Sequence, residues 1–259
     1  MRAILEYIGK AVNDGLGWAG GMAVMFVQAV LSGLRRPLGI YDVFYQIVAL
    51  GIRSMPLATL MGVFVGMALT WQFGEALMSF GAKNAVGSAA ALALVRELVP
   101  TIMALTVGAK IATGMTAELG SMKVSEQIDA IASLGADPVK KLIWPRLAAA
   151  TIALPLLCVY GNVLALGGGA LIADTVFDVP AGYFYETYVD ELYPMDYISG
   201  LVKATTFGML TGIIGCYQGF QTKFGTEAVG ISTTNTVVAT SVTIIIMDFV
   251  LTMIFLPVG

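Results

Sequence analysis

Residues 147–173 read LAAATIALPLLCVYGNVLALGGGALIA, a run of 27 residues without one charged side chain. A helix needs about 20 such residues to cross the hydrocarbon core of a bilayer. Further uncharged runs cover residues 15–34, 54–74, 204–222 and 228–247, and a run over 84–109 is interrupted only by Arg96 and Glu97. The sequence therefore predicts an all-α integral membrane protein, with residues 1–259 forming a single membrane domain.

The composition supports a membrane protein and excludes several other classes. Of the 259 residues, 58% are hydrophobic and 12% are charged, whereas soluble domains carry about 25% charged residues. A net charge of −3 with scattered basic residues argues against nucleic-acid binding. The chain has no histidine, and so lacks the usual general base and the commonest metal ligand. Cys158 and Cys216 lie inside apolar runs, where we expect them to pack as small hydrophobic residues.

The charges of the connecting segments predict the orientation. Residues 110–146 hold five basic residues, whereas residues 174–196 hold six acidic and no basic ones. Because positive loops stay in the cytoplasm, we expect 110–146 inside and 174–196 in the periplasm. Five spans then cover about 54–74, 84–109, 147–173, 197–222 and 228–257, so that the core is 54–257. The N-terminus is predicted to be cytoplasmic and the C-terminus periplasmic.

The first apolar run does not fit as a sixth span. Lys10 precedes it and Arg35 follows it, so both flanks are expected in the cytoplasm. We therefore predict a helix over 1–14 on the inner leaflet and a re-entrant or interfacial segment over 15–34. A cleaved signal peptide is the alternative, but Glu6 and Asp14 precede the apolar run and no small-residue cleavage site follows it.

Four ionisable residues fall inside the predicted spans, all between the midplane and the outer leaflet: Arg96, Glu97, Lys203 and Asp248. A charge at the bilayer centre costs a few kcal/mol, so we expect one buried cluster of two cations and two anions. It is either a structural set of ion pairs or a site for a substrate or protons, and the residues leave both open.

Two further patterns predict contacts. Leu69, Phe73, Leu77 and Phe80 recur at helical spacing and continue past the first span. This apolar face needs a cover, which is the protein's own core, a partner chain, a second copy or a lipid tail. Glycines 208, 212, 215 and 219 stack on one face of the fourth span, and Gly62 and Gly66 form a similar pair, so both helices are expected to pack closely.

The cytoplasmic loop contains a predicted short amphipathic helix, over about 124–134. Ile128 and Ile131 share one face with Val124, and Glu126 and Asp129 lie beside it. Gly135 ends the helix, and Asp137-Pro138 begins the next. We expect this helix to dock into a partner subunit, with both isoleucines buried there.

Several motifs together resemble the MlaE/YrbE permease family. They are LVRELVP at 94–100, GAK at 108–110, TAELG at 116–120, EQIDA at 126–130, GADP at 135–138, PR at 145–146, GCYQG at 215–219 and GIS at 230–232. The similarity extends from about residue 40 to nearly the end. Lys110, where the family has arginine, and residues 231–233 depart from the pattern.

This resemblance implies a permease subunit of a bacterial inner-membrane ABC transporter. It implies a homodimer bound to two ATPase subunits and to a periplasmic ring of MCE-domain protein, with a phospholipid or related lipid as cargo. The chain has no G-x-x-x-x-G-K-S/T phosphate loop, so ATP and Mg²⁺ are expected on the partner ATPase, with no cofactor or metal here.

The resemblance also places the lipid. Facing copies of the apolar face would enclose the tails, Leu98 would close the bottom of the cavity, and Arg96 would meet a phosphate. A proton- or ion-coupled secondary transporter that uses the charged cluster is the alternative function. A membrane-embedded enzyme is a third possibility, but the chain lacks a nucleophile with its base.

Overall fold

The computed structural model describes residues 2–35, 39–223 and 225–255, and the secondary structure of these residues is all helical. The long helices are α1 (Arg2–Gly33), α2 (Ile40–Ser79), α7 (Trp144–Phe177), α9 (Pro194–Phe220) and α10 (Thr226–Phe255). A sixth long segment runs from 83 to 124 and is built of η1 (Lys83–Ala85), α3 (Val86–Ala93), η2 (Leu94–Leu98), α4 (Val99–Met103), η3 (Ala104–Gly108) and α5 (Ala109–Val124). These six segments are long and apolar enough to cross a membrane.

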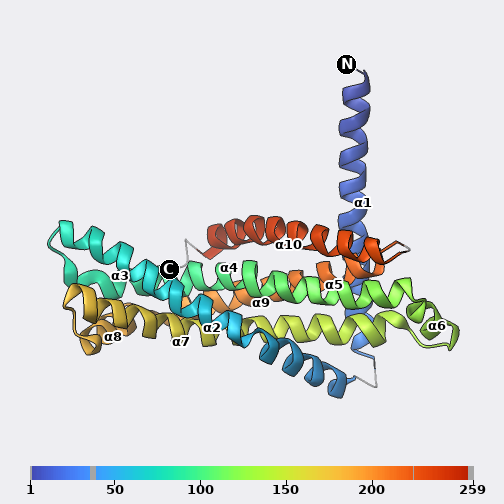
Figure 1. Ribbon diagram of the computed structural model, residues 1–259. Helices are drawn as coiled ribbons and strands as arrows, with labels where there is room; N and C mark the ends of the chain where they lie inside the picture. Colours follow the sequence, from blue (N-terminus) through green and yellow to red (C-terminus); the bar gives the residue numbers. More distant parts are fainter. Residues whose placement is uncertain (1, 36–38, 224, 256–259) are drawn as a thin grey trace.

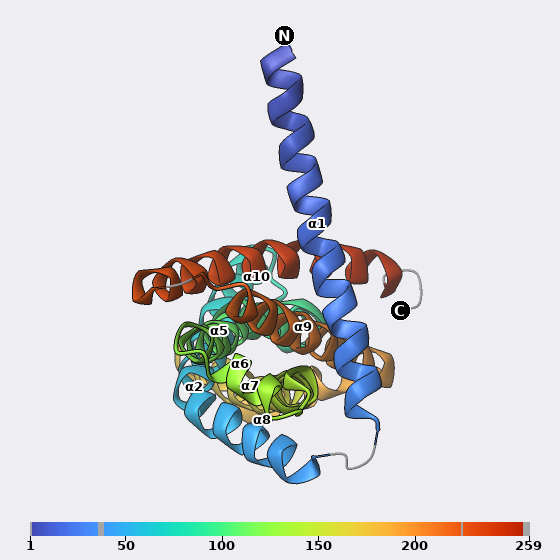
Figure 2. The ribbon, with the colours of Figure 1, turned by 90° about the vertical axis from the view of Figure 1, so that its right-hand side faces the viewer.

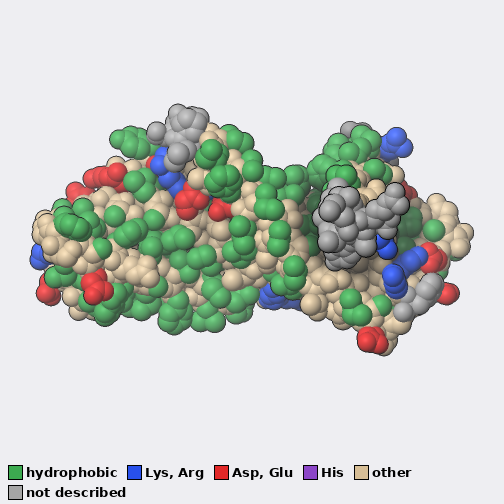
Figure 3. Space-filling model, turned by 90° about the horizontal axis from the view of Figure 1, so that it is seen from above, with side chains coloured by type: hydrophobic (Ala, Val, Ile, Leu, Met, Phe, Trp, Pro, Cys, Tyr) green, Lys and Arg blue, Asp and Glu red, His purple; other side chains and the backbone are tan. Residues whose placement is uncertain are grey.

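Five of these segments run lengthwise through the molecule, and α1 runs across one end of it (Figures 1 and 2). Each of the five spans predicted from the sequence falls on one of the lengthwise segments. Helix α2 begins 14 residues before its predicted span and the segment 83–124 continues 15 residues past its own, whereas the other described ends differ by five residues or fewer. Hydrophobic side chains cover much of the length of the face in Figure 3, and charged side chains gather mainly toward its two ends. This distribution is that of a bundle standing in a bilayer.

Helix α1 corrects the prediction of two N-terminal segments. Residues 2–33 form one uninterrupted helix, so the two predicted segments, 1–14 and 15–34, are continuous with each other. No proline occurs before residue 37, and glycines alone weaken a helix without ending it. The second half of α1 packs on the bundle end: the rings of Trp18 and Tyr217 meet edge to face at 6.3 Å, and Gly33 lies against Trp144.

Close helix packing rests on glycine, as predicted. A Cβ atom at Gly66 of α2 would overlap the carbonyl oxygen of Ala165 in α7. On α9, a Cβ at Gly208 would lie 2.5 Å from the carbonyl oxygen of Ala150 in α7, and one at Gly215 would lie 2.7 Å from that of Ala112 in α5. The glycine stripe of α9 thus fits between α7 and α5.

Wide helical turns precede two prolines. The π-helical segment η2 ends two residues before Pro100, and η4 (Val139–Ile143) ends two residues before Pro145. A proline ring collides with the carbonyl group four residues earlier in a regular α-helix, and a wider turn relieves this collision. The π-turn of η2 contains Arg96 and Glu97.

Short helices close the two ends of the bundle. Helix α6 (Gln127–Ser133) lies in the segment 110–146, within the range 124–134 predicted for a short helix. Helix α8 (Ala181–Asp190) lies in the acidic segment 174–196, where no helix was predicted. Its Phe184 and Tyr188 are buried, and the two rings contact each other at 6.0 Å.

Candidate functional site

Lys203 is the buried centre of an ion-pair cluster that joins three segments of the bundle, and the side chains of its partners Glu97 and Asp248 are 39% and 21% exposed. Its side chain on α9 is 1% exposed, and its Nζ lies 2.5 Å from Oε2 of Glu97 and 3.3 Å from Oδ1 of Asp248 on α10. Nζ also donates a hydrogen bond of 2.8 Å to the hydroxyl of Thr252. The prediction that Glu97, Lys203 and Asp248 come together is therefore confirmed.

Arg96 does not join this cluster, which corrects the prediction of one four-residue group. Its Nε lies 2.5 Å from Oδ1 of Asp196, a residue with a 1% exposed side chain in the first turn of α9. The other Asp196 oxygen accepts the backbone N–H of Tyr193 at 2.8 Å. Asp196 was counted with the acidic loop because no apolar run includes it. Pro194 at the first helical turn, with an acidic residue two positions later, is the signal that places it inside the helix.

The Arg96–Asp196 pair and the Lys203 cluster differ in net charge and in the exposure of the cation. Arg96 and Asp196 neutralise each other, whereas Lys203 faces two carboxylates, so its cluster carries a formal charge of −1. Thr101 donates a 3.0 Å hydrogen bond to Asp248 and thereby satisfies part of its charge. The cations differ too, since Lys203 is buried while one third of the Arg96 side chain is exposed. The part of the chain that is described gives the terminal guanidinium nitrogens of Arg96 no hydrogen-bond acceptor.

The apolar face predicted to hold lipid is largely covered by the chain itself. Leu69, Phe73 and Leu77 are half-buried and pack against the protein's own hydrophobic core. Only Phe80, at the end of α2, stands free with 83% exposure, and Leu98 is half-buried. The continuous wall predicted from the spacing is thus reduced.

The isoleucines of helix α6 are not placed as predicted. Ile128 is 4% exposed and Ile131 half-buried, and both pack inside this chain, so Ile128 is not available to a partner. Asp129 receives two hydrogen bonds from Lys123, of 2.9 and 3.0 Å. Glu126 is exposed, with a left-handed φ of 59°, and Leu134 is 86% exposed. The surface that α6 presents outward is therefore Glu126, Asp129 and Leu134.

An ion pair missed by the sequence reasoning anchors the segment that carries α6. Nη2 of Arg146 lies 2.7 Å from Oε1 of Glu118, which ties α7 to α5. Nη1 of Arg146 donates to the carbonyl oxygen of Leu142 at 2.8 Å. Glu118 and Arg146 belong to the sequence motifs TAELG and PR, and neither motif by itself indicates that the two side chains pair.

Comparison with known proteins identifies the family. The Permease MlaE family profile matches residues 43–254. A probable ABC transporter permease of Rickettsia prowazekii is 34% identical over 255 residues, 98% of each chain. The protein TRIGALACTOSYLDIACYLGLYCEROL 1, chloroplastic, of Arabidopsis thaliana is 35% identical over 239 residues, 92% of this chain and 68% of the relative. A probable ABC transporter permease of Synechocystis is 32% identical over 224 residues, 86% of this chain and 85% of the relative.

These matches confirm the resemblance noted in the sequence motifs. A permease of this class is a multi-pass membrane subunit and is not itself catalytic. The chain belongs to the MlaE family of ABC transporter permeases.

Proposed function

We propose that this permease moves phospholipid, or a related lipid, between the inner membrane and a periplasmic MCE-protein partner. The observation that carries the proposal is the family match over residues 43–254. The Arabidopsis relative adds support, because it is named for trigalactosyldiacylglycerol, a lipid. ATP binding and hydrolysis, with Mg²⁺, belong to a separate ATPase chain.

The outer half of the bundle supplies chemistry that suits such a cargo. Arg96 is partly exposed, and its terminal nitrogens remain available to a phosphate, for which a planar guanidinium is well suited. Phe80 and the half-buried Leu77 and Leu98 lie on the segments that flank it. A lipid tail would contact these residues and also the exposed parts of Leu69 and Phe73, which are half-buried on α2.

The lipid site is tested by photo-crosslinking. A photoreactive residue at Leu77 or Phe80 in the purified complex should capture labelled phospholipid. The same residue at Leu171, an exposed position on α7, measures capture of bulk bilayer lipid, and capture at Leu77 or Phe80 should exceed it. Capture of only a second permease chain at both test positions would show that these side chains form a dimer interface without lipid.

The placement of α1 supports the predicted topology. The helix crosses the bundle at the end that carries α6 and the basic loop 110–146 (Figure 1). Because positive loops are retained in the cytoplasm, this end is proposed to be cytoplasmic. Helix α1 then lies along the inner leaflet, the other five segments span the membrane, and the C-terminus is periplasmic.

The proposed assembly has two permease chains, two ATPase subunits and a periplasmic ring of MCE-domain protein. Within it, α6 presents Glu126, Asp129 and Leu134 to the ATPase, while Ile128 and Ile131 hold α6 to its own chain. The family match favours this ATP-driven assembly over the alternative of an ion-coupled secondary transporter. The Lys203 cluster is accordingly proposed to be structural.

A further inference from the structure

A cavity lies in the half of the bundle that leads to α6 and the basic loop 110–146, away from the Lys203 cluster. It has a volume of about 640 Å³ and is lined by residues of α2, α5 and α10. Gln46 and Arg53 reach it from α2, Lys110 and Thr113 from α5, and Thr233 from α10. Leu50 supplies part of an apolar wall.

The charge of this cavity is positive and uncompensated. The side chain of Arg53 is exposed and forms no ion pair within the described ranges 2–35, 39–223 and 225–255. Lys110 is also exposed, and its Nζ donates to the carbonyl oxygen of Arg53, which leaves its charge unneutralised. Glu118 also lines the cavity, but its carboxylate is paired with Arg146. Two cations therefore stand beside each other with no free carboxylate.

The donor set matches a phosphate group. An arginine offers a fork of N–H donors and a lysine offers three N–H donors. The half-buried Gln46 adds an amide donor on the same face of α2 as Arg53, two helical turns before it. The hydroxyl of Thr113 already donates its hydrogen to the carbonyl oxygen of Ala109 at 2.9 Å, so we do not count it among the donors for the phosphate.

The depth of the cavity in the membrane indicates that the phosphate belongs to a lipid. Arg53 immediately precedes the uncharged run 54–74, and Lys110 immediately follows the run 84–109. Both cations thus stand where hydrocarbon gives way to headgroups, at the end of the bundle that carries the basic loop. Basic pockets between membrane helices on the cytoplasmic side are suited to anionic headgroups.

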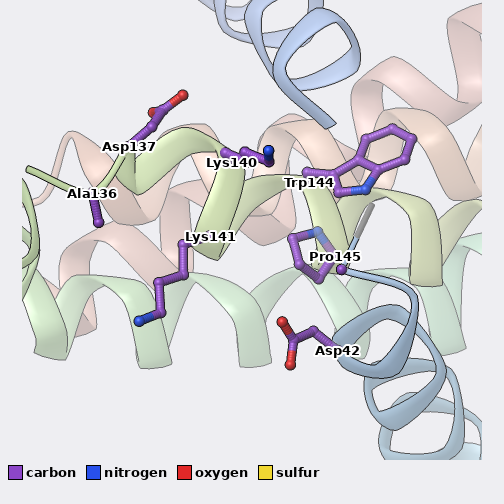
Figure 4. Close-up of a pocket in the computed structure, with 8 residues that line it drawn as sticks. Asp42, Ala136, Asp137, Lys140, Lys141, Trp144 and Pro145 are labelled. Carbon is purple, nitrogen blue, oxygen red and sulfur yellow. The ribbon is translucent and has the colours of Figure 1, made fainter. Parts of the chain in front are cut away.

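A neighbouring cavity shows what distinguishes this one. Figure 4 shows a cavity of about 240 Å³ at the same end of the bundle, where Lys140 and Lys141 are accompanied by Asp42 and Asp137. Its lining carries two charges of each sign and has no net attraction for an anion. The cavity between α2 and α5 differs because its cations are in excess.

We propose that Arg53, Lys110 and Gln46 bind the phosphate of an anionic phospholipid of the inner leaflet, at a site separate from the outer lipid site. The phosphate sits between the guanidinium and the ammonium, and the glycerol backbone and tails leave the cavity past Leu50 into the bilayer. This site does not depend on which lipid the permease transports.

The test uses the full-length permease in complex with its ATPase, in nanodiscs of phosphatidylcholine with a trace of labelled phosphatidylglycerol and without ATP. A photoreactive residue at Ala49, which lines the cavity, should capture the phosphatidylglycerol. The double variant Arg53→Gln with Lys110→Gln should lower capture about tenfold or more, since each lost charge-assisted hydrogen bond is worth about a factor of ten.

Two control variants separate binding from folding. Arg53→Lys with Lys110→Arg keeps both charges and should keep most of the capture, whereas Lys140→Gln with Lys141→Gln alters the charge-balanced cavity and should leave capture unchanged. Thermal unfolding of each variant identifies a loss of capture that comes from misfolding. If the double glutamine variant fails to fold, a fall in capture on raising the salt concentration in the wild-type complex is the supporting result.

Three outcomes would overturn the proposal. They are capture that is unchanged in the folded double variant or at high salt, equal capture of labelled phosphatidylcholine, and capture of a second permease chain in place of lipid. Competition by soluble glycerol phosphate at the same concentration as the lipid would assign the cavity to a free anion and would overturn the lipid source. None of these outcomes bears on the outer site at Leu77 and Phe80, so the two hypotheses fail independently.

Discussion

Lys203 shows at the scale of one residue how a charge is tolerated inside the bundle. Removing its ammonium leaves Glu97 and Asp248 facing each other without a cation. Breaking a fully buried pair costs about 3–5 kcal/mol, and the 39% exposure of the Glu97 side chain makes the cost smaller here. We expect Lys203→Met to lower the melting temperature clearly, and Lys203→Met combined with Glu97→Gln and Asp248→Asn to recover much of the loss.

The measurement is thermal unfolding of the detergent-purified permease, followed by tryptophan fluorescence. Lys223→Met, which changes an exposed lysine, is the control and should unfold as the wild type does. Losses that simply add up across the three substitutions would contradict the ion-pair account.

Tyr188 makes a different residue-scale prediction, because its buried hydroxyl has no hydrogen-bond partner among the described residues. Tyr188→Phe removes this unsatisfied group and should leave stability unchanged or raise it by up to about 1 kcal/mol. Burial raises the pKa of the Tyr188 phenol, so the folded chain keeps a proton that the unfolded chain loses above about pH 10. Wild-type stability should therefore fall above about pH 10, and melting curves should show a smaller fall for Tyr188→Phe.

Glycine positions on α2 give a matched pair at the scale of elements. Gly66→Ala places a methyl group on the backbone of α7 and should destabilise by about 1–3 kcal/mol through overpacking. Gly51→Ala lies on the same helix with no atom within 4 Å of the added carbon, so it should be neutral or slightly stabilising. Equal melting temperatures for the two variants would contradict the close approach of α2 and α7.

Helix α6 is tested through its exposed end. Leu134→Asp should leave the melting temperature of the permease unchanged, because this side chain is 86% exposed, while it weakens co-purification of the ATPase and lipid-stimulated ATP hydrolysis. Tyr41→Asp, at an 81% exposed position outside α6, is the matched control. A Leu134→Asp complex that assembles and hydrolyses ATP normally would show that α6 is not the coupling element.

The lengthwise helices could be predicted because an uncharged run of bilayer length has few other structures available to it. Other features depend on partners distant in the sequence. The direction of α1 depends on Tyr217 and Trp144, α8 depends on the burial of Phe184, and the partner of Arg96 depends on where α9 begins. The isoleucines of α6 had the pattern of a docking face, but periodicity cannot tell whether an apolar face is buried by its own chain or by another.

At the scale of the whole molecule, the crossing of α1 gives a topology prediction. Cysteines placed at Gly9 and Leu34, near the two ends of this helix, should both react with an impermeant maleimide from the cytoplasmic side. The native Cys158 and Cys216 are buried and should contribute little background. Labelling of the two positions from opposite sides of the membrane would show that α1 is a sixth span.

The Lys203 cluster also constrains the order in which the chain enters the membrane. Glu97 leaves the ribosome before Lys203, and Asp248 leaves after it. An unpaired lysine inside a span is costly to insert. Residues 83–124 therefore supply a counter-ion, Glu97, before α9 enters the membrane. Helix α10 then joins a lysine–glutamate pair that is already neutral. Only 11% of its most apolar stretch is buried inside the chain. Nascent chains stalled before α10 should therefore hold α9 in the bilayer, whereas chains whose Glu97 has been replaced by Gln should release it more readily.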